Sequence, residues 1–341
     1  MHGAKIMYTV DRPLSLRLSR LSFVAAVMVV LQHAYAPYWS GTLEKVLCFG
    51  VVIWDVPYFF AVAGILLFKD YDGWSMSWYR CKVFGRIRTL LVPYVCWTIY
   101  GIVLGAIAVW IGLRPNTFHF NDISWWFSAT GISEASMYAG HLWFIRRLFL
   151  FVLISPLIAW CAKRIGWWLM PLFLVMYVFN FKSAATWSNL AFFYFGACCV
   201  IRSDQLIRQK IGKSGFVAVA CFYAMMLYVR YMTMGADVLF VERCGELLAI
   251  GGGLMFVNML YERFISFFRF VDGVKQYSFL IYCAHYSLYQ YIKATIKPVI
   301  PEGGALIAFL IGLLISILIA GGVKRFFPQL YAITSGGRGA K

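Results

Sequence analysis

Long apolar runs alternate with short basic connections along almost the whole chain. The runs recur from Leu21 to Val323, and a run of about 20 apolar residues is long enough for a helix to cross a bilayer core. Apolar windows of about 19 residues, bounded by charged, glycine and proline clusters, predict ten transmembrane helices. We expect them at 21–38, 46–68, 89–112, 144–162, 165–181, 188–201, 214–234, 245–261, 277–292 and 303–323.

The connections between the runs predict the topology. Ten helices place both termini on one side of the membrane, and the connections on that side hold 22 of the 31 lysines and arginines. Because basic residues accumulate in cytoplasmic loops, both termini are expected in the cytoplasm. The longest opposite connection, residues 114–141, carries Asp122, Glu134 and many aromatic residues. It is too polar to span the membrane and is expected to form a structured outer cap.

Composition excludes an ordinary soluble protein. Of the 341 residues, 62% are hydrophobic and only 13% are charged, and the mean hydropathy is +0.74. We therefore expect an all-α, polytopic membrane protein with one transmembrane domain over 1–330 and a flexible cytoplasmic tail over 331–341. The net charge of +17 does not indicate a nucleic-acid partner, because the basic residues are dispersed between apolar runs.

No bound metal or cofactor is expected. The sequence has nine cysteines but no CxxC pair, and most of the cysteines lie in or beside apolar runs, where cysteine behaves as a small hydrophobe. Basic residues before the first apolar run, with Ala34-Tyr35-Ala36 after it, resemble a signal peptide. The later spans favour a retained first helix instead.

Three ionisable residues lie inside predicted spans. His33 is twelve residues beyond Leu21, about 18 Å along the first helix. Asp55 lies in the second helix at a comparable depth, where it could orient the His33 ring, or else pair with a basic residue. His285 lies eight residues into the ninth helix and is either functional or a hydrogen-bonded core histidine. Intramembrane ionisable residues are costly, so each is a candidate functional residue.

Two basic groups are candidate binding residues. Arg80, Lys82, Arg86 and Arg88 precede the third helix on the cytoplasmic side and suit a phosphate group, although such clusters also fix topology or meet anionic lipids. At the outer end of the fourth helix, Arg146 and Arg147 lie where the positive-inside rule disfavours cations. His141, Trp143 and Arg146 suit a sugar acceptor; the alternatives are an interfacial anchor at Trp143 and an ion pair or snorkelling at the arginines.

Six short segments, in order, resemble the membrane acyltransferase family 3. They are 27–33 (VMVVLQH), 56–64 (VPYFFAVAG), 86–94 (RIRTLLVPY) with Trp97, 141–146 (HLWFIR) with Ser155-Pro156, 192–196 (FFYFG) and 278–285 (SFLIYCAH). The resemblance implies transfer of an acyl group, commonly acetyl, from cytoplasmic coenzyme A to a hydroxyl of a carbohydrate or glycolipid at the outer face. It implies a multi-pass protein of the inner cell membrane, with His33 as the catalytic residue and Arg86 and Arg88 as donor-binding residues.

One position departs from the family pattern. The family usually has an arginine eleven residues before the histidine, and this chain has Ser22 there. Arg20 is no simple substitute, because at 100° per residue it points to another face of the helix. This departure leaves open an altered donor or acceptor, or a non-catalytic partner in glycan assembly.

The expected chemistry agrees with the residues. A thioester is already activated, so an enzyme must position the two substrates, remove the hydroxyl proton and stabilise an oxyanion. His33 could act as the general base or as a nucleophile that forms an acyl-imidazole. A transporter or flippase that uses His33 and Asp55 to carry protons is the alternative from another class.

Overall fold

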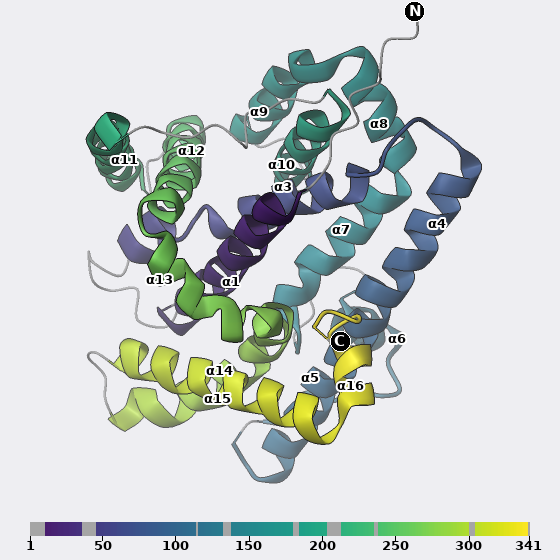
Figure 1. Ribbon diagram of the computed structural model, residues 1–341. Coiled ribbons are helices and arrows are strands. Elements are labelled where there is room, and N and C mark those ends of the chain that lie inside the picture. Colours follow the sequence, from purple (N-terminus) through teal and green to yellow (C-terminus); the bar gives the residue numbers. More distant parts are fainter. Residues whose placement is uncertain are drawn as a thin grey trace, which may run out of the picture. The chain divides into compact units, whose positions relative to one another are not determined.

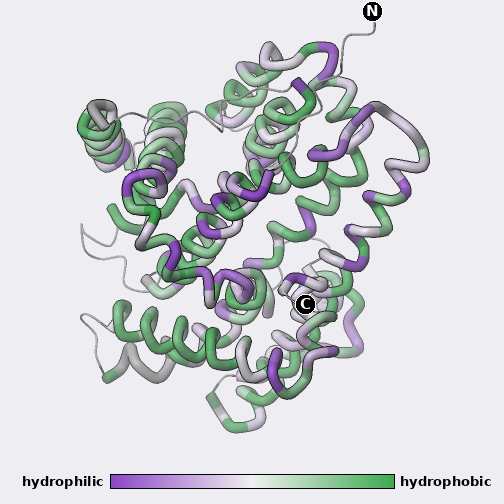
Figure 2. Tube along the Cα trace, viewed as in Figure 1, coloured by the Kyte–Doolittle hydropathy of each residue, from purple (hydrophilic) through white to green (hydrophobic). Residues whose placement is uncertain are grey.

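The computed structural model describes residues 11–35, 46–113, 115–131, 138–179, 184–202, 213–234, 238–299 and 304–339. Helices dominate, and the described part of the chain contains no β-strand (Figure 1). Figure 2 shows that apolar residues cover long stretches of several helices, such as α15. These features confirm an all-α membrane protein.

Each of the ten predicted ranges contains helix, but the helices differ in length. Among the described residues, six are long and apolar enough to cross a membrane, or seven if one broken pair counts as a single span. The six are Arg12–Ala34, Leu47–Phe68, Met76–Trp110, Gly215–Thr233, Phe240–Arg263 and Gly304–Phe326, and the broken pair is Gly140–Leu153 with Ser155–Arg164. The number of ten spans and the cytoplasmic position of the termini therefore stay predictions.

Proline explains the broken pair. Helix α7 (Trp143–Leu153) ends just before α8 (Ser155–Arg164), which has Pro156 in its first turn. Proline lacks the backbone N–H that would continue the hydrogen-bond ladder, and its ring collides with the preceding turn. The predicted span 144–162 is therefore two helices.

The described chain forms two compact units. The first comprises Met1–Gln32, Tyr38–Lys82 and Phe151–Lys275. It contains most of α1 (Arg12–Tyr35), with α3 (Asp55–Phe68), α8, α9 (Met170–Val178), α10 (Ala184–Ile201), α11 (Lys213–Thr233), α12 (Leu239–Arg263) and α13 (Ile265–Phe270).

Two glycines hold α3 and α10 together in this unit. A Cβ atom on Gly64 would collide with the backbone carbonyl of Phe193, and a Cβ on Gly196 would collide with that of Ala61. The two helix backbones thus touch at reciprocal glycines. Small residues permit this close approach between membrane helices.

An ion-pair network ties α1 to the end of the first unit. Arg20 donates from Nε and Nη2 to both carboxylate oxygens of Asp272, at 2.9 and 2.6 Å, and from Nη1 to the Tyr261 hydroxyl at 3.1 Å. Lys275 donates to the same carboxylate. These two cations hold the pKa of Asp272 well below its ordinary value, with the Arg20 hydrogen bonds contributing most.

The second unit comprises His33–Pro37, Val83–Leu150 and Gln276–Lys341. Its first helices are η3 (Ile87–Leu91), a π-helical turn, and α5 (Val92–Trp110), which continues from it. They are followed by α6 (Ile123–Thr130), η4 (Gly140–Leu142), most of α7, α14 (Ser278–Val299), α15 (Gly304–Phe326) and α16 (Pro328–Thr334). Helices α14 and α15 pack closely because Gly312 leaves room for the Tyr289 ring, whose hydroxyl donates to the Phe309 carbonyl at 2.6 Å.

The segment after Tyr331, which the sequence predicts as a flexible tail, has secondary structure up to Gly339. It continues α16 to Thr334 and then forms turns to Gly339. Tyr331 and Ser335 are buried, and the Trp97 ring nitrogen donates to the Thr334 carbonyl at 2.9 Å. The glycines that suggested disorder include Gly336, Gly337 and Gly339, which adopt positive φ angles in these turns.

Candidate active site

Three histidines from separate parts of the sequence meet inside the second unit. The ring of His285, on α14, lies 5.2 Å from that of His33, at the end of α1, and 5.0 Å from that of His141, in η4. His141 and His285 are buried, and His33 is half-buried. Such a group of imidazoles can accept, hold and pass protons.

Carbonyl partners define the proton positions on two of these rings. The Nδ1 atom of His285 lies 2.6 Å from the Tyr282 carbonyl oxygen, and the Nε2 atom of His141 lies 2.9 Å from that of Cys283. A carbonyl oxygen only accepts, so these two nitrogens carry the hydrogens. In the neutral rings, Nε2 of His285 and Nδ1 of His141 are therefore the nitrogens with lone pairs.

Tyr286 completes the cluster. Its ring packs edge-on against His33 at 5.2 Å and stacks on His141 at 5.1 Å. Gly140 leaves space for this ring, since a Cβ there would lie 3.3 Å from the Tyr286 hydroxyl. Tyr282 binds the His141 backbone through a hydrogen bond from its hydroxyl to the His141 carbonyl. Aromatic side chains thus fix two of the three imidazoles in place.

A cationic pair lies on the same unit. Arg338 donates to the Thr89 carbonyl at 2.9 Å, and its guanidinium stacks 4.0 Å above the Phe279 ring of α14. Burial, together with the charge of Arg86, lowers the pKa of Arg338 to about 10. Within the described ranges, neither guanidinium forms an ion pair with a carboxylate. Two neighbouring cations without an acidic partner suit an anionic ligand.

Helix α14 connects the cationic pair to the histidines. Phe279 lies under Arg338, and Cys283, one turn further, accepts the hydrogen bond from His141. The Arg338 charge also interacts with the Cys283 side chain. At 1.5 Å per residue, Phe279 and His285 are about 9 Å apart along the helix axis. One extended ligand could therefore contact both groups.

The remaining basic candidates near the third span occupy different surroundings. Arg88 lies in η3 and is exposed, as is Arg80 on α4 (Met76–Arg86). Lys82 lies 3.8 Å from the Asp70 carboxylate and 5.8 Å from the centre of the Trp78 ring. Arg80 and Lys82 belong to the first unit, whereas Arg86 and Arg88 belong to the second.

Asp55 is buried at the start of α3 in the first unit. One carboxylate oxygen accepts from the Val56 N–H at 2.5 Å, and the other is buried without a hydrogen-bond partner in the described part of the chain. His33 belongs to the second unit. The expected orientation of His33 by Asp55 therefore stays a prediction.

The structure places the three residues predicted to bind the acceptor in different surroundings. His141 is only 4% exposed and joins the histidine cluster through its contact with the His285 ring; its assignment to the acceptor stays a prediction. Trp143 and Arg146 are half-buried at the start of α7, where the Trp143 ring also lies 4.7 Å from the Arg147 guanidinium. Both stay candidates for acceptor contacts.

Arg20 does not replace the missing family arginine. Its guanidinium is fully engaged by Asp272 and Tyr261 within the first unit, in agreement with the helical angle that separates it from the Ser22 position. The sequence interpretation missed Arg338, because a glycine-rich terminal segment is typical of disorder. It also missed Tyr286, although this residue follows His285 directly.

Comparison with known proteins identifies the family. The family model described as an acyltransferase domain, of acyltransferase family 3, matches residues 21–323. The chain is 25% identical over 371 residues to the succinoglycan biosynthesis protein ExoH of Rhizobium meliloti (strain 1021), an alignment that covers 97% of this chain and 95% of the relative. No solved structure matches the chain. The protein, with its histidine cluster and apolar helices, belongs to the membrane acyltransferase family 3.

Proposed function

We propose that this acyltransferase moves an acetyl group from cytoplasmic acetyl-coenzyme A to a hydroxyl of a carbohydrate or glycolipid at the outer face of the inner cell membrane. The observation that supports it most is the packing of His33 against His285 and Tyr286. The relative named for succinoglycan biosynthesis supports a glycan acceptor. The basic residues of the second unit support a phosphate-bearing donor.

The donor lies along α14 in this proposal. Arg86 and Arg338 hold its phosphates, with Arg88 as an outer cation that attracts it, and the thin pantetheine arm reaches the histidines. Arg80 and Lys82, of the first unit, stay sequence-based candidates for the donor. Guanidinium groups bind phosphate through short charge-assisted hydrogen bonds. The stacking of Arg338 on Phe279 keeps its guanidinium plane fixed for this contact.

The reaction then needs one proton acceptor. His33 removes the proton of the acceptor hydroxyl while the hydroxyl oxygen attacks the thioester carbonyl carbon. The tetrahedral intermediate collapses, the C–S bond breaks, and the coenzyme A sulfur leaves and takes up a proton. His285 and His141, with their lone-pair nitrogens, assist His33 by holding or passing the proton. Trp143 and Arg146 bind the acceptor.

An assay with purified protein in lipid nanodiscs tests the proposal. Acetyl-coenzyme A and a neutral oligosaccharide are added, and mass spectrometry follows the mass of an acetyl group added to the sugar. We expect acetylated sugar and free coenzyme A in equal amounts. Transport of an oligosaccharide into proteoliposomes without any thioester cleavage would instead show a transporter or flippase, and would contradict the proposal.

A further inference from the structure

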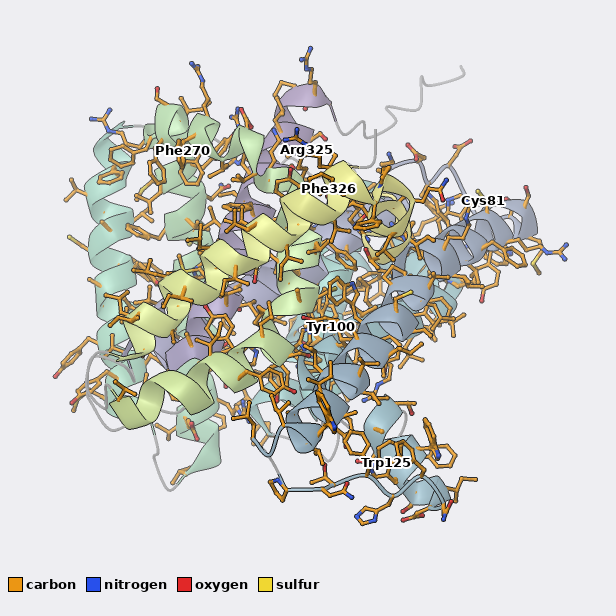
Figure 3. All side chains as sticks on the ribbon, turned by 90° about the horizontal axis from the view of Figure 1, so that it is seen from below. Cys81, Tyr100, Trp125, Phe270, Arg325 and Phe326 are labelled. Atoms are coloured by element: carbon orange, nitrogen blue, oxygen red, sulfur yellow. The ribbon has the colours of Figure 1, made fainter. Side chains whose placement is uncertain are left out.

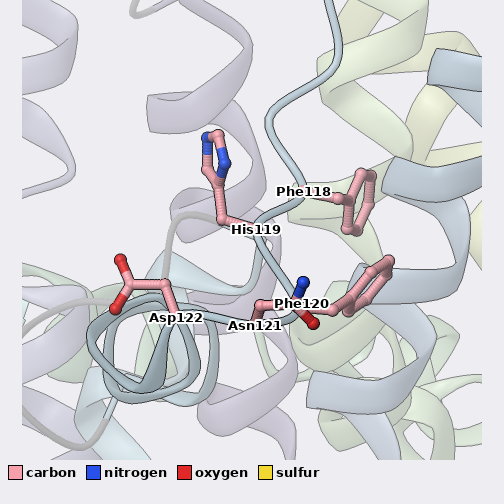
Figure 4. Close-up of a pocket in the computed structure, with 5 residues that line it drawn as sticks. All are labelled: Phe118, His119, Phe120, Asn121 and Asp122. Atoms are coloured by element: carbon pink, nitrogen blue, oxygen red, sulfur yellow. The ribbon is translucent and has the colours of Figure 1, made fainter.

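An aromatic group in the connection after α5 forms a pocket that is separate from the histidine cluster in sequence. The pocket has a volume of about 480 Å³ and is lined by five consecutive residues, Phe118, His119, Phe120, Asn121 and Asp122. Its size falls in the range of small-molecule sites. Figure 4 shows the Phe118 and Phe120 rings on one side of the loop, and His119 and Asp122 on the other.

A rigid aromatic base supports this pocket. Phe118 stacks on Tyr138 at 5.3 Å and on Phe120 at 5.4 Å, and buried Trp125 packs against Phe118 and Phe120 at 5.6 and 5.1 Å. Figure 3 shows Trp125 among the side chains that surround α6. Aromatic rings that pack against one another in this way have little conformational freedom.

Hydrogen bonds fix the loop as well. The Trp125 and Trp126 ring nitrogens donate to the carbonyls of Thr117 and Phe120, at 2.9 and 3.0 Å. Asp122 caps α6 by accepting from the Ser124 N–H and hydroxyl, at 2.8 and 2.7 Å, and these bonds lower the pKa of its carboxyl. The loop is thus organised before any ligand binds.

The outer part of the group is exposed although its base is buried. Phe120 is 57% exposed and Trp126 is 43% exposed, whereas Trp125 is only 4% exposed. The exposed side chains of His119, Asn121 and Asp122, which line the same pocket, offer hydrogen-bond donors and acceptors. The surface therefore combines flat apolar rings with closely spaced polar groups.

We propose that this pocket binds pyranose rings of the glycan acceptor, with a sugar face on Phe120 and sugar hydroxyls on Asn121, Asp122 and His119. The exposed Trp126 ring, 6.0 Å from the Phe120 ring, adjoins this surface. A pyranose has an apolar C–H face and a rim of hydroxyls, which matches both features of the pocket. The identity of this sugar as the acceptor rests on the proposed function. Sugar binding itself does not, because it needs neither donor nor His33.

The alternation of aromatic and polar residues favours a sugar over lipid. An interfacial anchor places its rings in the headgroup region and needs no pocket. Here the Asp122 carboxylate lines the same pocket as the rings, and its hydrogen bonds to Ser124 lower its pKa. A negative charge there opposes contact with anionic headgroups. The same carboxylate is a good acceptor for sugar hydroxyls.

Binding of defined tetrasaccharides tests this pocket. The full-length protein in phosphatidylcholine nanodiscs is titrated with cellotetraose, maltotetraose and β-1,4-galactotetraose by calorimetry, in the absence of acyl donor. We expect saturable binding of one or more of them, weakened about tenfold by Phe120→Ala and by Asn121→Ala. The matched control is Phe127→Ala, since Phe127 is an exposed aromatic residue of α6 outside the pocket lining.

The outcomes separate this inference from the proposed function. Acetyl transfer to soluble oligosaccharide with no tetrasaccharide binding at the pocket, or with binding that both variants preserve, overturns the pocket but not the enzyme. Sugar binding that is lost in the variants, without any acetyl transfer, supports the pocket and contradicts the enzyme. The fluorescence of Trp126 is obtained as the difference between the wild type and Trp126→Phe. If brominated lipid quenches this fluorescence and sugar does not, Trp126 is a membrane anchor and the proposal is overturned.

Discussion

The ring of His33 lies 5.2 Å from the ring of His285, although one belongs to the first helix of the chain and the other to α14. Neither residue has a local motif that predicts the other. Their meeting with His141 gives the candidate general base two further imidazoles, each with a defined lone-pair nitrogen. This arrangement predicts that the three histidines act together rather than as isolated polar residues.

The proposed function has His285 assist His33 by holding or passing the proton. We expect His285→Asn to lower kcat, by less than the loss of His33, with little change in the donor KM, because the asparagine amide still donates to the Tyr282 carbonyl but has no basic nitrogen. The pH profile of kcat should shift. Ser287→Ala is the control: Ser287 lies two residues further along α14, its hydroxyl donates to the Tyr138 carbonyl, and its loss should leave that profile unchanged. If His285→Asn lowers the Tm and leaves the pH profile of kcat unaltered, His285 has a structural role only.

The cationic pair should control donor binding. Arg86→Ala and Arg338→Ala should each raise the donor KM about tenfold or more, since a hydrogen bond to a charged group contributes about 1.5–3 kcal/mol. The salt dependence of KM should also weaken. Arg325→Ala is the control, a cation at the end of α15 beside Phe326. Equal KM values in all three variants, measured in steady-state assays with varied acetyl-coenzyme A, would refute the assignment.

Helix packing in the first unit should depend on Gly196. Gly196→Val places a side chain against the backbone of Ala61, and overpacking of this kind costs about 1–3 kcal/mol. Thermal melting in detergent should show a lower Tm. Gly251→Ala is the matched control, because nothing lies within 4 Å of its added Cβ; alanine is the better helix former, so its Tm should stay equal or rise. Equal melting of both variants would contradict the observed α3–α10 contact.

Acid should weaken the Arg20–Asp272 contact. The pKa of Asp272 in the folded protein is lower than the ordinary carboxyl value of 3.8. The stabilisation that the ionised carboxylate contributes is therefore complete above pH 3.8, and it is lost as the pH falls through the pKa of the folded protein. Asp272→Asn should therefore lower the Tm at neutral pH, and the difference from the wild type should shrink at strongly acidic pH. A constant difference across the whole pH range would show that the asparagine acts through packing rather than charge.

The sequence predicted the helical class and ten ranges that each contain helix, because long apolar runs have few other solutions in a membrane. It did not predict the break before Pro156, since hydropathy windows average over a single proline. It identified His33, His141 and His285 separately, and His141 was assigned to the acceptor. Periodicity along one helix contains no information on which distant helix lies opposite, so their meeting required the three-dimensional structure.

The close contact between α3 and α10 at two glycines was not predictable from the sequence either. Gly64 and Gly196 belong to two separate family-like segments, and the structure shows that each is small because the other helix's backbone touches it. Arg338 lay in a segment whose composition is typical of disorder, yet the turns at Gly336 and Gly337 return the chain to Thr89. Composition predicts average behaviour and does not detect one specific contact.

The central claim is that His33 performs the chemistry at this cluster. The most direct measurement is acetyl transfer from acetyl-coenzyme A to oligosaccharide by purified His33→Ala and wild-type protein, with melting curves of both. The proposed function predicts a rate loss of about 10²- to 10⁴-fold in a variant that binds donor and melts like the wild type. Unchanged acetyl transfer by a well-folded His33→Ala protein would contradict it.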